Sequence, residues 1–198
     1  MEYRLANEDD SIKEIFELVY DSDPVIYRDL FGEFKSGLEV YKLLYKNKDS
    51  IFYKDNYRIA LSDDKRIIGV CTNYDKHVRW NPDVVKTAFL IAGVKIPESF
   101  YAVSHYFTKT YNYSHLQVAA CNVCVRKEYR GQGVGSFMMA NLLDEAGNND
   151  IQLSVLKTNK AAINLYEKFG FKIIEEFNDY GGYNQPDLIS YQMYRMTK

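Results

Sequence analysis

The sequence has few of the residues that build disulfide frameworks and metal centres. Of its 198 residues only three are cysteines: Cys71, Cys121 and Cys124. A sparse, odd number is expected of a protein in a reducing compartment. Cys121 and Cys124 have the spacing of a metal or redox pair, but "LQVAACNVCV" (116–125) is strand-like, and residues three apart in a strand point to opposite faces. No further ligands lie at suitable spacing, so no metal site is expected.

The sequence also lacks a basic block and a long hydrophobic run. Its formal net charge is −2, which favours neither nucleic acid nor an anionic membrane surface as a partner. The apolar stretches, such as "VVKTAFLIAGV", are too short to span a bilayer. The first residues, "MEYRLANEDD", are acidic where a secretory signal is basic. We therefore expect a cytoplasmic protein without a nucleic-acid or membrane partner.

What the sequence does contain is apolar and aromatic material for a core. Hydrophobic residues make up 46%, and 198 residues fit a single domain over 1–198. There are 18 tyrosines and 11 phenylalanines. These favour an aromatic core, with an aromatic-lined cavity or large interface as the alternative.

The hydrophobic periodicity predicts a mixed α/β sheet covered by helices. A strand at 2–6 precedes helices within 9–22, 23–32 and 36–48, and a hairpin at 57–74 turns at Asp63–Lys65. Ser11 and Glu14 form the capping-box pattern of the first helix start. Residues 76–116 contain one or two helices and are expected to be an insertion or a substrate-facing segment. From 116 onward the expected order is strand, helix, strand, helix, strand, strand.

Three glycines separate a predicted strand from a predicted helix in "VRKEYRGQGVGSFMM" (125–139). The first amides of a helix have no partner within it, and the helix dipole adds positive charge there. Glycines would let a phosphate approach those amides closely. Neither the dinucleotide pattern G-x-G-x-x-G nor the Walker pattern G-x-x-x-x-G-K-[ST] fits the spacing. The segment therefore predicts a phosphate site for another class of ligand.

The run from Arg130 to Gly135 resembles the coenzyme A loop, [Q/R]-x-x-G-x-[G/A], of the GNAT N-acyltransferase superfamily. The segment "NKAAINLYEKFGF" (159–171) is similar to the second signature of that superfamily, and the order and spacing of the two agree over about 118–171. Lys127 stands where a proline is frequent. The resemblance implies an α/β fold with a mixed, mostly antiparallel central sheet, flanking helices and splayed central strands.

The resemblance also implies the residues of an acyl-donor site. The diphosphate of coenzyme A would lie against Arg130, Gly131, Gln132, Gly133, Val134, Gly135 and Ser136. The backbone of Val123, Cys124 and Val125 would pair with the pantetheine arm. Asn159, which the sequence also predicts as a helix cap, would contact that arm. Lys160 and Lys168 are expected to be solvated rather than to bind the 3′-phosphate.

Tyr166 is the catalytic candidate, because a nearby hydroxyl can protonate the leaving thiolate of coenzyme A. Packing in the core is the alternative for this side chain. The predicted strand before the glycines contains no acid, so a general base is not identified. Four residues are near enough in sequence to be candidates for the base: His105, His115, Glu98 and Asp75. Each is more typical of a surface or turn. The segment 74–83 predicts either a substrate lid or an exposed loop anchored by Trp80.

Together these features predict an N-acetyltransferase that moves an acetyl group from acetyl-CoA to a primary amine by direct attack in a ternary complex. Cys124 is not expected to be a nucleophile, since no histidine partner is evident. The acceptor would be the amine of a small molecule or a peptide. The alternative is a module that binds or senses coenzyme A without turnover, and a third is a structural or dimerising domain. Whether the protein forms a homodimer stays open.

Overall fold

The alternating runs at 57–74 form the hairpin that the sequence predicts. In the computed structural model, β2 (Tyr57–Leu61) pairs antiparallel with β3 (Ile67–Asp75). Lys65 has a φ of 65°, which the tight turn between these strands requires. The structure describes residues 1–75, 78–110, 118–177 and 189–196, with the side chains of 75, 109–110 and 118–122 excepted.

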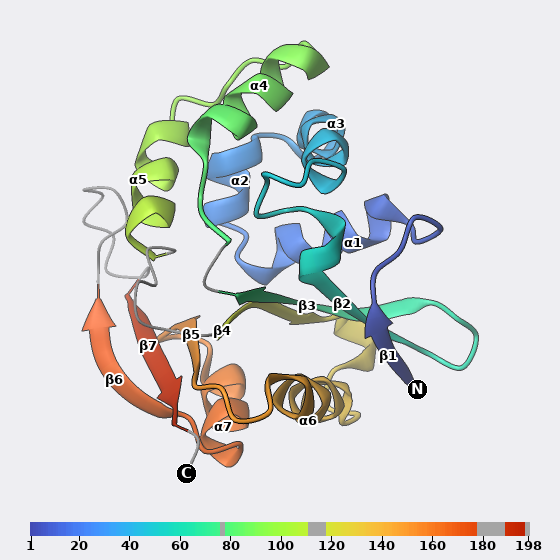
Figure 1. The fold of residues 1–198 in the computed structure, drawn as a ribbon, viewed down its shortest axis with the longest axis vertical. Coiled ribbons are helices and arrows are strands. Elements are labelled where there is room, and N and C mark those ends of the chain that lie inside the picture. The colour runs from blue at the N-terminus through green and yellow to red at the C-terminus, as the bar shows by residue number, and fades with distance from the viewer. Residues whose placement is uncertain (76–77, 111–117, 178–188, 197–198) are drawn as a thin grey trace.

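The hairpin lies within a mixed, mostly antiparallel sheet whose seven described strands have the order β1-β2-β3-β4-β5-β7-β6. Figure 1 shows this sheet between two layers of helices. The remaining strands are β1 (Glu2–Leu5), β4 (Val118–Val125), β5 (Ile151–Leu156), β6 (Lys172–Phe177) and β7 (Ser190–Arg195). The expected α/β class is therefore confirmed.

One face of the sheet carries the N-terminal helices and those of the segment predicted as an insertion: α1 (Ile12–Ser22), α2 (Ile26–Phe31), α3 (Phe34–Tyr45), α4 (Pro82–Ala92) and α5 (Phe100–Thr110). The start of α1 is the predicted one, since the Ser11 hydroxyl accepts a hydrogen bond of 3.3 Å from the Glu14 amide. Phe16 and Val19 of its apolar stripe are fully buried. A short 3₁₀ helix, η1 (Lys54–Asn56), leads from this layer into β2.

The core on this face is built from aromatic rings. Phe16 packs against Phe31, Phe34 and Tyr41 with ring centroids 4.6 to 5.4 Å apart. The rings of Phe16, Phe31 and Tyr41 are fully buried. These aromatic residues thus build part of the core, as the sequence predicts.

The other face carries α6 (Val134–Ala146) and α7 (Lys160–Lys168), preceded by the 3₁₀ helix η2 (Lys127–Tyr129). Close packing of α6 on the sheet depends on Gly69 of β3. A Cβ atom at that position would collide with the Met138 sulfur. A second hydrophobic core, which includes Met138, Leu142, Ile151 and Ile163, fills the space between these helices and the sheet.

The segment predicted as an insertion packs on the N-terminal helices. The Trp80 indole N–H donates to the Ser104 hydroxyl at 2.9 Å, and its ring lies 4.7 Å from that of Phe107. Ser99 donates to the Asp29 carbonyl at 2.8 Å, which ties the segment to α2. Trp80 is therefore the anchor of its loop, and residues 76–77 within the predicted lid lie outside the described residues.

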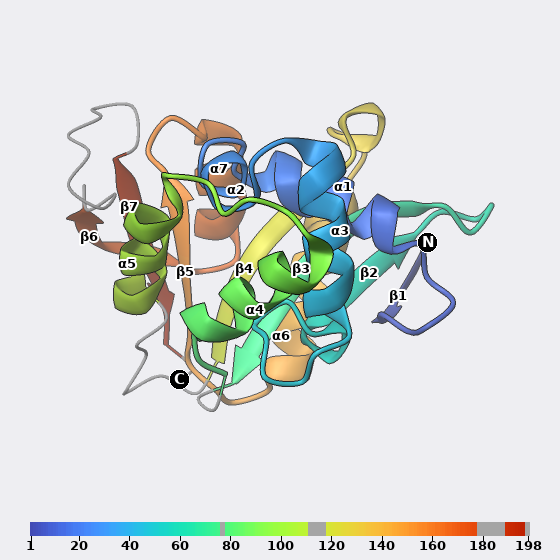
Figure 2. The ribbon, with the colours of Figure 1, turned by 90° about the horizontal axis from the view of Figure 1, so that it is seen from above.

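The two central strands separate, as expected. Over the described strands, β4 pairs with β5 in parallel only at Val118↔Ile151 and Ala119↔Gln152. From there β4 follows β3 as far as Gly69↔Val125, whereas β5 follows β7 as far as Leu156↔Ser190. Figure 2 shows the two strands diverging. Among the described residues, one edge of β4 is consequently left without a strand partner over its second half.

A bulge in β4 lies within this separated half. Val70 is opposite Cys124 and Thr72 is opposite Cys121, so residues 122 and 123 together face Cys71. The regular alternation of faces does not hold between Cys121 and Cys124, which corrects the strand argument used for that pair. Cys71 and Cys124 are buried free thiols.

No helix of the described residues has the length and apolar character needed to cross a membrane.

Candidate functional site

The glycine-rich turn after β4 exposes backbone where the sequence predicts an anion site. Gly131 and Gly133 have φ values of 75° and 87°, in the left-handed region that favours glycine. Gly133 caps α6, and the first helical bond runs from the Phe137 amide to the Gly133 carbonyl at 2.9 Å. The amides of Val134, Gly135 and Ser136 therefore have no partner within the helix.

The space around this turn is open. A Cβ atom built on Gly131 or Gly133 would meet nothing within 4 Å, and both residues are exposed. A charged oxygen of a ligand can thus reach the amides without crossing side chains. This arrangement is the one expected of a phosphate-binding helix N-terminus.

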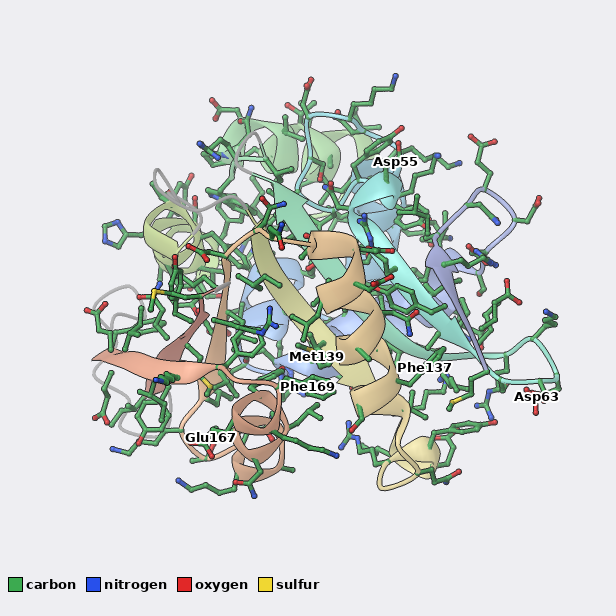
Figure 3. The ribbon with its side chains drawn as sticks, turned by 60° about the horizontal axis from the view of Figure 1, so that its bottom comes forward. Asp55, Asp63, Phe137, Met139, Glu167 and Phe169 are labelled. Atoms are coloured by element: carbon green, nitrogen blue, oxygen red, sulfur yellow. The ribbon has the colours of Figure 1, made fainter. Side chains whose placement is uncertain are left out.

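Gly135 has a different role from its two neighbours. A Cβ atom there would lie 3.2 Å from the Leu165 Cδ2 atom of α7. Figure 3 shows α6 and α7 side by side, with Met139 labelled on α6 and Phe169 at the end of α7. Gly135 therefore allows the two helices to pack closely, which is a structural reason for the third glycine.

The side chains of the turn fold back on its own backbone. Arg130 Nε donates to the Val125 carbonyl at 2.9 Å, and Gln132 Nε2 donates to the Glu128 carbonyl at 2.7 Å. Both side chains remain exposed. The guanidinium of Arg130 is held beside the glycines in this way, where it adds positive charge to the exposed amides.

A pocket of about 90 Å³ adjoins the turn on the α1 side of the sheet. Its walls come from α1 and from the end of β4 with η2: Glu17, Leu18, Asp21, Cys124, Val125, Arg126, Lys127, Glu128 and Arg130. The acids of α1 are more than 100 residues from the glycines in the sequence. Glu17 and Asp21 are four residues apart, as on one face of a helix, but that spacing is equally typical of a solvated face. It therefore does not predict a site.

The Cys124 side chain forms part of this pocket wall. Burial raises the pKa of its thiol to about 11, although the nearby Arg130 opposes the shift. The thiol is therefore protonated at neutral pH and is a poor nucleophile. This agrees with the expectation that no acyl-enzyme forms at Cys124.

The two signatures lie on opposite sides of the strand separation. Val123, Cys124 and Val125 belong to the unpaired part of β4, and the turn of residues 130–136 follows directly. Asn159 follows β5, on the other side, and its side chain accepts a 3.2 Å hydrogen bond from the Ala162 amide. The capping role predicted for Asn159 is thus confirmed, and its contact with a cofactor stays a prediction.

Tyr166 lies on α7, which follows β5. Its side chain is 5% exposed, and its ring centroid is 5.9 Å from that of Phe171. The ring of Tyr166 is therefore packed in the core, as the alternative for this side chain predicts. Its role as a proton donor stays a prediction. Lys160 and Lys168 are exposed, in agreement with the expectation that they are solvated.

Two of the four candidates for the general base are described with their side chains. His105 and Glu98 are exposed in the insertion. His115 lies outside the described residues, and only the backbone of Asp75 is described. Within the part of the chain that the structure describes, no group of three or more His, Cys, Asp or Glu could hold a metal ion.

Comparisons with known proteins agree with this geometry. The sequence model of the "Acetyltransferase (GNAT) family" matches residues 24–171. An uncharacterized N-acetyltransferase of Bacillus subtilis (strain 168), YobR, is 41% identical over 58 residues, which are 28% of this chain and 24% of that relative. The match therefore spans about a quarter of the relative's length.

Several solved structures share the whole fold at low identity. An N-acetyltransferase from Staphylococcus aureus Mu50 aligns over 98% of this chain and 100% of its own, with a TM-score of 0.66 and 17% identity. A NatC complex, solved with a Gag peptide and CoA, aligns over 100% of this chain and 98% of its own, with a TM-score of 0.57 and 14% identity. Because the family model covers most of the sequence, the chain belongs to the GNAT acetyltransferase family.

Proposed function

We propose that this protein transfers an acetyl group from acetyl-CoA to a primary amine of a small molecule or peptide. The observation that carries the proposal is the unpaired edge of β4, which leads directly into an open turn of exposed amides. An extended amide-containing arm can add to such an edge as a further strand. The same molecule can then place its diphosphate on the helix N-terminus.

The turn supplies two kinds of contact for the diphosphate. The amides at the start of α6 donate hydrogen bonds, and the helix dipole favours negative charge. Arg130 and Lys127, both exposed beside the turn, add cationic partners for phosphate oxygens. The diphosphate would therefore fix one end of the donor, and the thioester would lie farther back along β4.

The reaction itself is a direct displacement at the thioester. A neutral amine attacks the carbonyl carbon, a tetrahedral intermediate forms, and the carbon–sulfur bond then breaks to give the amide and a thiolate. Tyr166 donates its hydroxyl proton to the sulfur as the carbon–sulfur bond breaks, and water then returns a proton to Tyr166. The ordinary tyrosine pKa of about 10 is roughly 1.5 above the thiol pKa of about 8.5, so the transfer is only slightly uphill. The proton lost by the amine passes to water, and no side chain is assigned as the base.

A module that binds coenzyme A without turnover is the competing function, and the lack of an acid on the strand before the glycines favours it. Two measurements separate the possibilities. Isothermal titration calorimetry with coenzyme A tests the donor site, and release of free thiol from acetyl-CoA tests turnover with polyamines, amino acids, aminoglycosides and peptide N-termini. Binding together with amine-dependent thiol release supports the enzyme. Binding without release from any amine favours the module, and absence of binding overturns both.

A further inference from the structure

The residues that would hold the diphosphate have little packing of their own. Residues 130–133 are all exposed, and the first buried residue after them is Val134, which is 2% exposed. Its position depends on its own hydrogen bonds and on what fixes the chain at either end. Before the turn, Tyr129 packs on the second core, Glu128 pairs with Arg66 at 3.0 Å, and Arg126 adds the contacts that reach α1.

Arg126 fixes the end of β4 through its backbone. Its amide donates to the Ile68 carbonyl at 2.9 Å, which extends the pairing of β4 with β3 by one residue. Its carbonyl accepts from the Tyr129 amide at 2.9 Å and so begins η2. The chain leaves the sheet and enters the phosphate turn at this residue.

The Arg126 side chain fixes the same point to α1. Nε donates to the Ile67 carbonyl at 2.6 Å, Nη2 to Glu14 Oε1 at 2.9 Å and Nη1 to Glu17 Oε2 at 3.4 Å. The Arg126 side chain is only 12% exposed. Three of its five N–H groups are therefore engaged with protein, and its charge is matched by two carboxylates. It is better suited to hold the protein than to bind a phosphate.

These contacts also set one wall of the pocket beside the turn. Glu17 and Leu18 of α1 line the pocket opposite Val125 and Arg126. The ion pair between Arg126 and Glu17 thus joins α1 to the end of β4 at this wall. Without this ion pair, the turn and the pocket wall would lose the contact that joins them to α1.

We propose that Arg126 is a positioning residue for the acyl-donor site: by joining β4 to Glu14 and Glu17 of α1, it holds the phosphate turn in its binding position. The proposal rests on the proposed function, because it concerns the site assigned there to coenzyme A. Arg126 does not touch the donor in this role. Its removal should weaken donor binding while the protein stays folded.

The test is calorimetric titration of coenzyme A at 20 °C into Arg126→Gln, Arg126→Lys and the double variant Glu14→Gln/Glu17→Gln. We expect Kd to rise about tenfold in Arg126→Gln and in the double variant, and less in Arg126→Lys, which keeps one charged contact. The matched control is Arg58→Gln. Arg58 pairs with Glu145 of α6 at 2.8 Å and is 17% exposed, but it lies away from the turn. We expect this control to keep the wild-type Kd.

A merely structural role would lower the melting temperature of the variants without changing Kd at 20 °C, where each is still folded. The positioning role alone is overturned if the Kd of Arg126→Gln stays within twofold of wild type. Should Arg126→Gln fail to fold, the same limit applies to the double variant. If the wild-type protein itself does not bind coenzyme A, the proposed function fails, and the positioning role fails with it.

Discussion

At the scale of single residues, the candidate donor site depends on backbone conformations that only glycine adopts easily. Gly131 and Gly133 combine a positive φ with open space around the missing Cβ. Gly135 instead allows Leu165 to pack against α6. The three glycines look equivalent in the sequence, but only the first two expose backbone to a ligand.

Replacing Gly133 by glutamate should abolish binding of coenzyme A. A side chain at a φ of 87° costs about 1–2 kcal/mol in strain, and the carboxylate would repel the diphosphate. Gly93→Glu is the matched control, since Gly93 has a φ of 65° in the same left-handed region, similar open space and a position at the end of α4. Titration calorimetry should show no binding to Gly133→Glu and normal binding to Gly93→Glu. Equal affinities would place the diphosphate elsewhere.

Tyr166→Phe should lower kcat by about 100-fold, the usual contribution of a general acid, with little change in the Kd of coenzyme A. Phenylalanine keeps the ring that packs against Phe171. Tyr194→Phe is the control. It also removes one tyrosine hydroxyl, that of Tyr194 on β7, which donates to Asp150 at 2.7 Å. Thiol release is measured with whichever amine proves to be the acceptor. Wild-type kcat in Tyr166→Phe, under conditions where chemistry limits the rate, would exclude the acid role.

At the scale of elements, the N-terminal helices are tied to the sheet by a few charged contacts. Arg4 of β1 and Asp10, just before α1, form two hydrogen bonds of 2.8 and 2.7 Å. Burial raises the pKa of the Asp10 carboxyl, but the bonds from Arg4 and from the Asn7 amide outweigh it and leave that pKa below its usual value. The ionised form is thus favoured in the folded state.

Because the folded pKa of Asp10 is lowered, its contribution to stability is present above the unfolded pKa of about 4 and is lost as pH falls through the folded value. Asp10→Asn should therefore lower the free energy of unfolding by about 1–2 kcal/mol at pH 7, and the difference from wild type should shrink between pH 4 and pH 2. Urea unfolding at several pH values measures it. The control is Asp63→Asn, whose carboxylate is 99% exposed and should matter little. A difference that does not depend on pH would contradict the assignment.

At the scale of the whole molecule, the sheet separates two cores and the insertion shares one of them. Phe89 of α4 and Phe100 and Val103 of α5 are fully buried in the same cluster as Phe16 and Tyr41. The insertion therefore has no core of its own among the described residues. We propose that residues 1–198 unfold as one cooperative unit.

The single tryptophan makes this testable, because Trp80 belongs to the insertion. Its fluorescence and the far-UV circular dichroism should give the same midpoint in urea. A third probe is the reactivity of Cys71 and Cys124, whose pKa values burial raises to about 12 and 11, so that alkylation at pH 8 should follow unfolding. A Trp80 transition at lower urea than the other two would show that the insertion unfolds separately.

The sequence by itself determined the elements whose signals are local. The cap at Ser11, the hairpin turn near Lys65 and the glycine turn before α6 all depend on neighbouring residues, so their positions could be predicted. The two GNAT signatures lie in such segments, and the family followed from them. The splay of β4 and β5 was expected from that resemblance rather than from any pattern in the strands.

Only the tertiary structure decided which distant residues meet. The approach of Glu14, Glu17 and Asp21 to the end of β4, more than 100 residues away, depends on how α1 crosses the sheet. The bulge beside Cys124 and the different role of Gly135 likewise depend on a partner strand and a partner helix. Such contacts depend on packing between surfaces, for which neither residue carries a signal in its own neighbourhood.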